Sequence, residues 1–114
     1  MVDFDRLLEL LEKADYAVDC DCSVTTLAYL RIAKDEAYRL VGDAENPGEA
    51  MRLRRAAQYV ERKVLAAPDF REAAHYAWAF WRGFVGGWED HTMPGRVSDA
   101  YKMGRRFSTL RAAP

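Results

Sequence analysis

The sequence contains little of what a disulfide framework or a membrane span requires. Only two of its 114 residues are cysteine, and Cys20 and Cys22 are too close together to close a useful loop. Its uncharged runs are far shorter than the ~20 residues of a membrane-spanning helix. The first residues are acidic, whereas a signal peptide begins with basic ones. We therefore expect a cytoplasmic protein with reduced thiols and no membrane contact.

Metal and catalytic motifs are equally scarce. Zinc requires four nitrogen or sulfur donors, and only His75 and His91, both distant in the sequence, could join Cys20 and Cys22. The aspartates around the cysteines lack the glycine and the final glutamate of a calcium loop. The acid–base candidates at residues 89–91 have only a neighbouring threonine as nucleophile. We expect no metal, no cofactor and no enzyme activity.

Apolar residues recur at helical spacing, and no stretch alternates as a strand would. Helix starts are indicated by Ser23, by Asn46 followed by proline, and by Asp69, while glycines mark helix ends. The pattern predicts a single all-α domain over residues 1–114, a compact bundle of four to five mostly antiparallel helices. The expected helices span about residues 4–16, 23–41, 47–66, 70–86 and 96–111.

The fourth expected helix carries most of the aromatic residues and should lie at the centre of the bundle. One of its faces is apolar, and the opposite face has small residues that let another helix approach closely. Tyr76 lies off the apolar stripe and Trp88 follows two glycines, so these are the aromatics we expect to be exposed. The apolar stripe consists of Phe70, Ala74, Ala77, Trp81, Phe84 and Trp88, and the small residues are Ala79, Gly83 and Gly86.

Two other helices have predicted buried faces. The second helix presents a stripe with Lys34 at its centre, and the face of the third is rich in alanine, which predicts close packing. The first stripe is Val24, Leu27, Leu30, Ala37, Tyr38 and Val41, and the second is Ala50, Leu53, Ala56, Ala57, Val60 and Val64.

Charge is distributed unevenly along the chain. Residues 1–50 hold 12 acidic and 5 basic side chains, a balance of −7, whereas residues 51–114 hold 6 acidic and 12 basic ones, a balance of +6. Such asymmetry indicates an electrostatic partner or head-to-tail self-association as a homodimer. The alternative is that oppositely charged helices pack side by side and neutralise each other within the fold.

The acidic half predicts a protein-docking face. A surface of this sign can occupy a basic groove and exclude nucleic acid from it. The compact, charge-segregated and motif-poor chain resembles in type the small phage-encoded inhibitors, anti-CRISPR proteins among them. The leading hypothesis is therefore a non-enzymatic inhibitor or adaptor that docks on a partner protein. Its most concrete target is a host nucleic-acid-binding machine. The face consists of Glu9, Glu12, Asp15, Asp19 and Asp21.

The basic half offers the alternative. Cations around one tyrosine on the third helix could hold phosphates, with the ring free to stack, and the fifth helix adds further cations. This face would bind nucleic acid or an acidic partner, although no established nucleic-acid-binding motif is present. Its residues are Arg52, Arg55, Tyr59, Arg62, Lys63, Lys102, Arg105 and Arg106.

Overall fold

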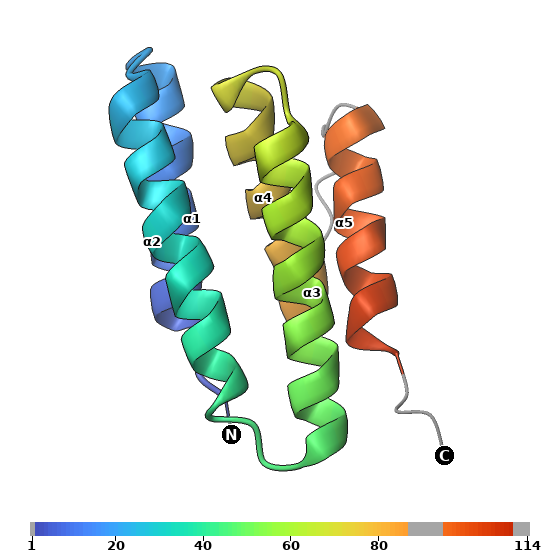
Figure 1. Ribbon diagram of the computed structural model, residues 1–114. Coiled ribbons are helices and arrows are strands. Elements are labelled where there is room, and N and C mark those ends of the chain that lie inside the picture. The colour runs from blue at the N-terminus through green and yellow to red at the C-terminus, as the bar shows by residue number, and fades with distance from the viewer. Residues whose placement is uncertain (1, 87–94, 111–114) are drawn as a thin grey trace.

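The computed structural model describes residues 2–86 and 95–110. Within these ranges the chain forms helices and no strand, which confirms the all-α prediction (Figure 1). Trp88 and the acid–base candidates at residues 89–91 lie outside the described residues. The five described helices are α1 (Asp5–Asp19), α2 (Ser23–Val41), α3 (Pro47–Ala66), α4 (Phe70–Val85) and α5 (Gly95–Ser108).

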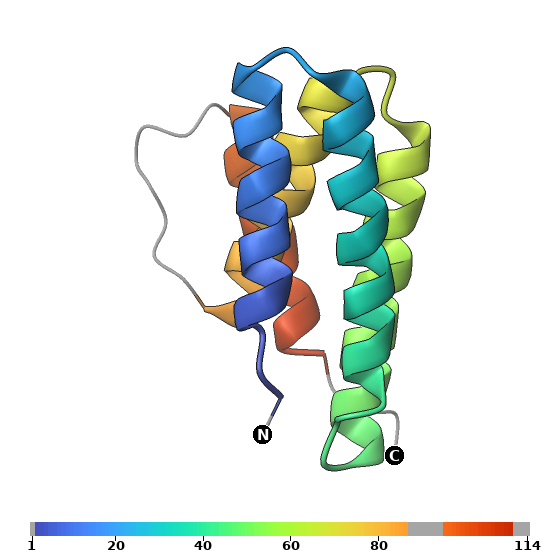
Figure 2. The same ribbon diagram turned by 90° about the vertical axis from the view of Figure 1, so that its left-hand side faces the viewer.

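The first four helices alternate in direction, as short connections between helices favour (Figures 1 and 2). Helix α5 breaks this pattern and runs parallel to α4: both begin at the end of the bundle where α1 ends. The packing agrees with this direction, because Tyr76 and Val97, which lie early in their helices, belong to one cluster with Ala79 and Ala100.

Local sequence signals account for most helix ends. The Asn46 side chain accepts a hydrogen bond from the Glu49 backbone N–H at 2.9 Å, and the Asp69 side chain caps α4 in the same way. Gly86 ends α4 in the left-handed conformation, with φ +95°, which a residue with a side chain rarely adopts. The predicted cap Ser23 is instead the first residue of α2, after Cys22 in the cap position.

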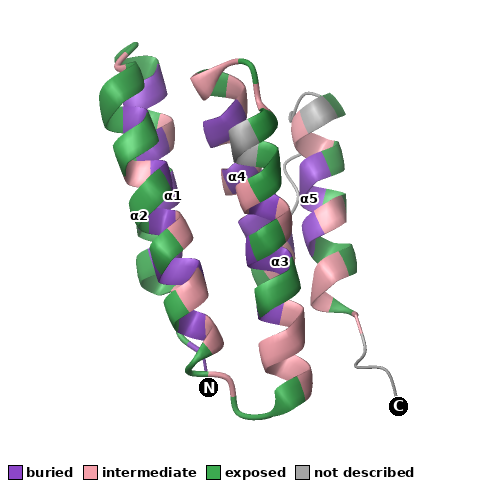
Figure 3. Ribbon diagram, in the orientation of Figure 1, coloured by how far each residue is buried: buried purple, intermediate pink, exposed green. Residues whose placement is uncertain are grey.

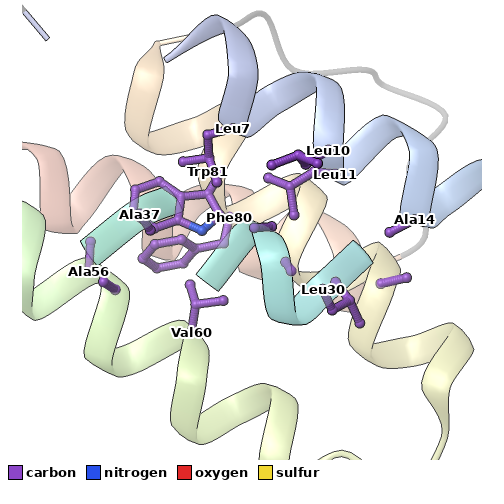
Figure 4. Close-up of a cluster of buried hydrophobic side chains, with 14 of the residues drawn as sticks. Leu7, Leu10, Leu11, Ala14, Leu30, Ala37, Ala56, Val60, Phe80 and Trp81 are labelled. Atoms are coloured by element: carbon purple, nitrogen blue, oxygen red, sulfur yellow. The ribbon is translucent and has the colours of Figure 1, made fainter. Parts of the chain in front are cut away.

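The core forms around α4, as predicted. Trp81 is only 2% exposed and meets Phe80 edge to face, with ring centroids 5.6 Å apart. Figure 4 shows both rings among Leu7 and Leu11 of α1 and Val60 of α3. Figure 3 shows that the buried positions of the helices face inward, while exposed positions run along their outer sides. One face of α4 thus packs against the first three helices.

The small residues on the other face of α4 meet a matching set on α5. Ala79 and Gly83 are four residues apart on α4, as Ala100 and Gly104 are on α5, and all four are buried. A Cβ atom at Gly83 would lie 2.0 Å from the Tyr101 carbonyl oxygen. A Cβ atom at Gly104 would lie 1.9 Å from the carbonyl oxygen of Phe80. The two backbones therefore touch where neither helix has a side chain.

Helix α2 is rotated from its predicted orientation. Val24 is 78% exposed and Leu27 is 40% exposed, although both belong to the predicted buried stripe. Polar side chains occupy buried positions instead, because they find partners there: the Thr26 hydroxyl donates to the Cys22 carbonyl oxygen at 2.8 Å, and Glu36 pairs with arginine. The buried face of α2 consists of Thr26, Leu30, Ala33, Glu36, Ala37 and Leu40.

The close contact between α4 and α5 generates a stability prediction. Adding one methyl group at Gly104 forces two backbones apart, so Gly104→Ala should lower the free energy of unfolding by about 3 kcal/mol. Gly95→Ala is the matched control, because its Cβ would meet nothing within 4 Å, and its effect should stay within about 0.5 kcal/mol. Urea unfolding followed by circular dichroism measures both values. Equal stabilities of the two variants would contradict the observed packing.

Candidate functional site

The acidic residues of the predicted docking face are largely engaged inside the fold. Three of them reach basic side chains on α4, and a fourth pairs within its own helix. Asp19 is exposed and forms no ion pair with any described residue. The pairs are Glu12–Arg82 at 2.7 Å, Asp15–His75 at 2.5 Å, Asp21–Arg71, and Glu9–Lys13 at 3.1 Å.

These pairs join the acidic half of the sequence to the basic half. Helices α1 and α4 pack side by side, so the Glu12 carboxylate faces the Arg82 guanidinium across their boundary and the Asp15 carboxylate faces the imidazole of His75. The charge asymmetry of the sequence is thus partly neutralised within the molecule, as the alternative interpretation predicted. Exposed ion pairs of this kind are each worth up to about 1 kcal/mol. Their larger consequence is that fewer carboxylates remain for an external partner.

Another buried charge lies between α1 and α2, where no motif predicted it. Glu36 is 7% exposed and accepts two hydrogen bonds from Arg39, at 2.6 and 3.0 Å, with Arg6 of α1 at 3.8 Å. Hydrogen bonding from Arg39 holds the pKa of Glu36 below its ordinary value. A glutamate three residues before an arginine is the only sequence signal for this pair, and such spacings are common on exposed helix faces.

On the basic half, the tyrosine predicted to stack with bases is already packed. The Tyr59 ring lies 5.3 Å from the Phe80 ring and 4.9 Å from the Phe107 ring, measured between centroids. Its hydroxyl lies 2.9 Å from the hydroxyl of Tyr76. Arg52 turns toward the same boundary and donates to the Leu110 carbonyl oxygen at 3.2 Å. Tyr59 therefore joins α3 to α4 and α5, and its ring is not available for base stacking.

Tyr76 is half-buried rather than exposed as predicted. Burial and the hydrogen bond with Tyr59 raise the pKa of Tyr76 above its ordinary value. The ammonium group of Lys63 lies 5.8 Å from the Tyr59 ring centroid and 5.9 Å from that of Tyr76. Lys63 thus makes cation–π contacts with both rings at the margin of this cluster.

Five of the predicted basic residues remain exposed and form no ion pair with the described part of the chain. They lie on α3 and α5, which contact each other in the bundle. One acidic residue, Asp99, is exposed on α5 as well. We call this set the basic surface: Arg55, Arg62, Lys102, Arg105 and Arg106.

The two cysteines lie at the turn between α1 and α2. Cys20 is exposed, and the half-buried Cys22 donates from Sγ to the Thr25 hydroxyl oxygen at 2.9 Å. Hydrogen bonds with Thr25 lower the pKa of the Cys22 thiol. Among the described residues, no group of three or more histidine, cysteine or acidic side chains is placed to hold a metal ion.

The ion pairs between α1 and α4 lead to a prediction about charge reversal. Glu12→Lys replaces the attraction to Arg82 by a repulsion, so the variant should lose roughly 1 kcal/mol of stability at low salt. The loss should shrink in 0.5 M NaCl, since salt screens exposed charges. Asp19→Lys serves as the control and should change the stability by less than about 0.5 kcal/mol. Thermal unfolding at both salt concentrations tests this, and identical curves for all three proteins would refute the internal pairing.

None of the described helices combines the length and apolar character needed to cross a membrane. Comparison of the chain with protein-family models, with curated proteins and with solved structures finds no match.

Proposed function

We propose that the chain is a non-enzymatic interaction module that binds an acidic partner protein through the basic surface of α3 and α5. One observation carries the proposal: the cations of this surface form no ion pair with the described residues, whereas most carboxylates of the predicted acidic face are engaged. Unpaired charges on neighbouring helices attract a partner of opposite sign and orient it.

A protein partner is favoured over nucleic acid for two reasons. Tyr59, the ring expected to stack on bases, is packed between Phe80 and Phe107. The basic surface is also confined to five cations on two helices, and the chain as a whole is not basic, with a net charge of −1. An acidic protein patch, limited in extent, matches a basic surface of limited extent.

The acidic docking face and the head-to-tail homodimer are both less favoured than the basic surface. Docking through Glu12, Asp15 and Asp21 would require a partner to replace the basic side chains that these carboxylates already contact. A head-to-tail homodimer would meet the same cost. Inhibition of a nucleic-acid-binding machine, as by a phage-encoded inhibitor, stays a prediction from the sequence about the biological role of the interaction.

Binding to polyglutamate, a simple acidic chain, tests the proposal. The double variant Arg55→Glu/Arg62→Glu should weaken binding by roughly tenfold at low salt, because two attractive charges become repulsive. The control is Arg31→Glu/Lys34→Glu, which makes the same change in net charge on α2 and should bind as the unmodified protein does. Fluorescence anisotropy with a labelled peptide gives the dissociation constants.

Two results would overturn the proposal. Equal losses in both double variants would show that net charge, rather than the basic surface, determines binding. Tighter binding of a DNA duplex than of polyglutamate at the same ionic strength would favour the nucleic-acid alternative. Circular dichroism of each variant confirms that the helices are retained.

A further inference from the structure

An apolar cavity of about 240 Å³ opens between α2 and α3 and reaches the centre of the bundle. Its inner wall includes Leu11 of α1 and Trp81 of α4, both almost completely buried. Figure 4 shows Leu11, Leu30, Val60 and Trp81, which come from four different helices and all line this cavity. The cavity is therefore lined both by core residues and by the partly exposed Leu27, and none of its lining residues belongs to the basic surface on α3 and α5.

The cavity exists because small side chains line it where α2 faces α3 and α4. Ala33, Ala37, Ala57 and Ala77 all contribute to its wall. The alanine-rich face of α3 is buried as predicted, at Leu53, Ala56, Ala57 and Val60, and the cavity lies beside the last two of these. An apolar cavity of roughly 150 Å³ can hold benzene, so in proportion this one has room for about ten carbon atoms.

The mouth of the cavity is charged. Arg31 and Lys34 of α2 and Glu61 of α3 are its charged lining residues. Glu61 already accepts a hydrogen bond from the Tyr38 hydroxyl. Burial is the main cause that raises the pKa of Tyr38 to about 12, and the hydrogen bond with Glu61 adds to it. The hydroxyl therefore stays protonated at neutral pH and continues to donate to the Glu61 carboxylate.

The two cations at the mouth have weaker partners. The Lys34 ammonium lies 3.9 Å from a carboxylate oxygen of Asp35, the residue next to it. Arg31 is exposed and forms no ion pair with the described residues. Leu27 lines the cavity and is also partly exposed, so the apolar lining continues to the surface. An occupant with an apolar chain and an anionic end matches both parts of the site.

We propose that this cavity binds a medium-chain carboxylate such as a fatty acid. Its hydrocarbon chain lies against Trp81 and the alanines, and its carboxylate lies at the mouth beside Arg31 and Lys34. Burial of the chain supplies most of the affinity, since each buried methylene contributes favourably. The cations then distinguish the carboxylate from a neutral molecule of the same length.

Titration with decanoate, with the indole N–H signals observed by NMR, tests the proposal at neutral pH. Trp81 lines the cavity, whereas Trp78 does not and serves as an internal reference. The Trp81 signal should shift saturably while that of Trp78 stays in place. Decanol, which has the same chain without the charge, should bind at least tenfold more weakly.

Variants separate the two halves of the site. Ala57→Leu and Ala33→Leu each fill the cavity and should abolish the shift while thermal unfolding shows a folded protein. Arg31→Glu/Lys34→Glu should remove the preference for decanoate over decanol. The matched control Arg55→Glu/Arg62→Glu should keep that preference, since those residues lie on the basic surface.

Several outcomes would overturn the proposal. The absence of a saturable Trp81 shift would rule out a site for this ligand. Equal affinities for decanoate and decanol in the unmodified protein would show a neutral apolar cavity that does not recognise the carboxylate. Unchanged decanoate binding by both folded cavity-filling variants would place the ligand elsewhere.

Discussion

Helices α4 and α5 approach so closely at Gly83 and Gly104 that neither position has room for a methyl group. This contact allows α4 to bury two opposite faces, one against α5 and the other against the first three helices. It also brings Phe107 to Tyr59 and Phe80, so that aromatic rings from three helices meet. The position of α5, and with it three of the five residues of the basic surface, depends on the absence of two side chains.

Burial of α4 also determines which charges are available to a partner. Its basic side chains emerge beside α1 and meet carboxylates there, as Arg82 meets Glu12. On α3 and α5, cations such as Arg55 and Arg106 remain exposed without ion pairs among the described residues. The balance of charge along the sequence therefore differs from the balance of charge that a partner would encounter.

The sequence was sufficient to predict the helices, the central position of α4 and its small-residue face. Local signals such as the cap at Asn46 and the glycine at residue 86 act within a few residues, so they can be recognised without the fold. The rotation of α2 could not be predicted, because the face that includes Val24 and Leu27 is at least as apolar as the face that the structure buries. Thr26 and Glu36 are buried through specific partners, and periodicity carries no information about partners. The same limit applies to the ion pairs of α1 and to the cavity, which depend on how helices distant in the sequence face each other.

The central claim is that the arginines of the basic surface are available to a partner, whereas Arg71 and Arg82 of α4 are paired within the fold. Arginine side-chain N–H signals in NMR, followed during titration with polyglutamate at low salt, test it most directly. Shifts are expected for Arg55, Arg62 and Arg106, while the signals of Arg71 and Arg82 stay unchanged. Shifts confined to Arg71 and Arg82 would contradict it, because they would place the accessible positive charge on α4.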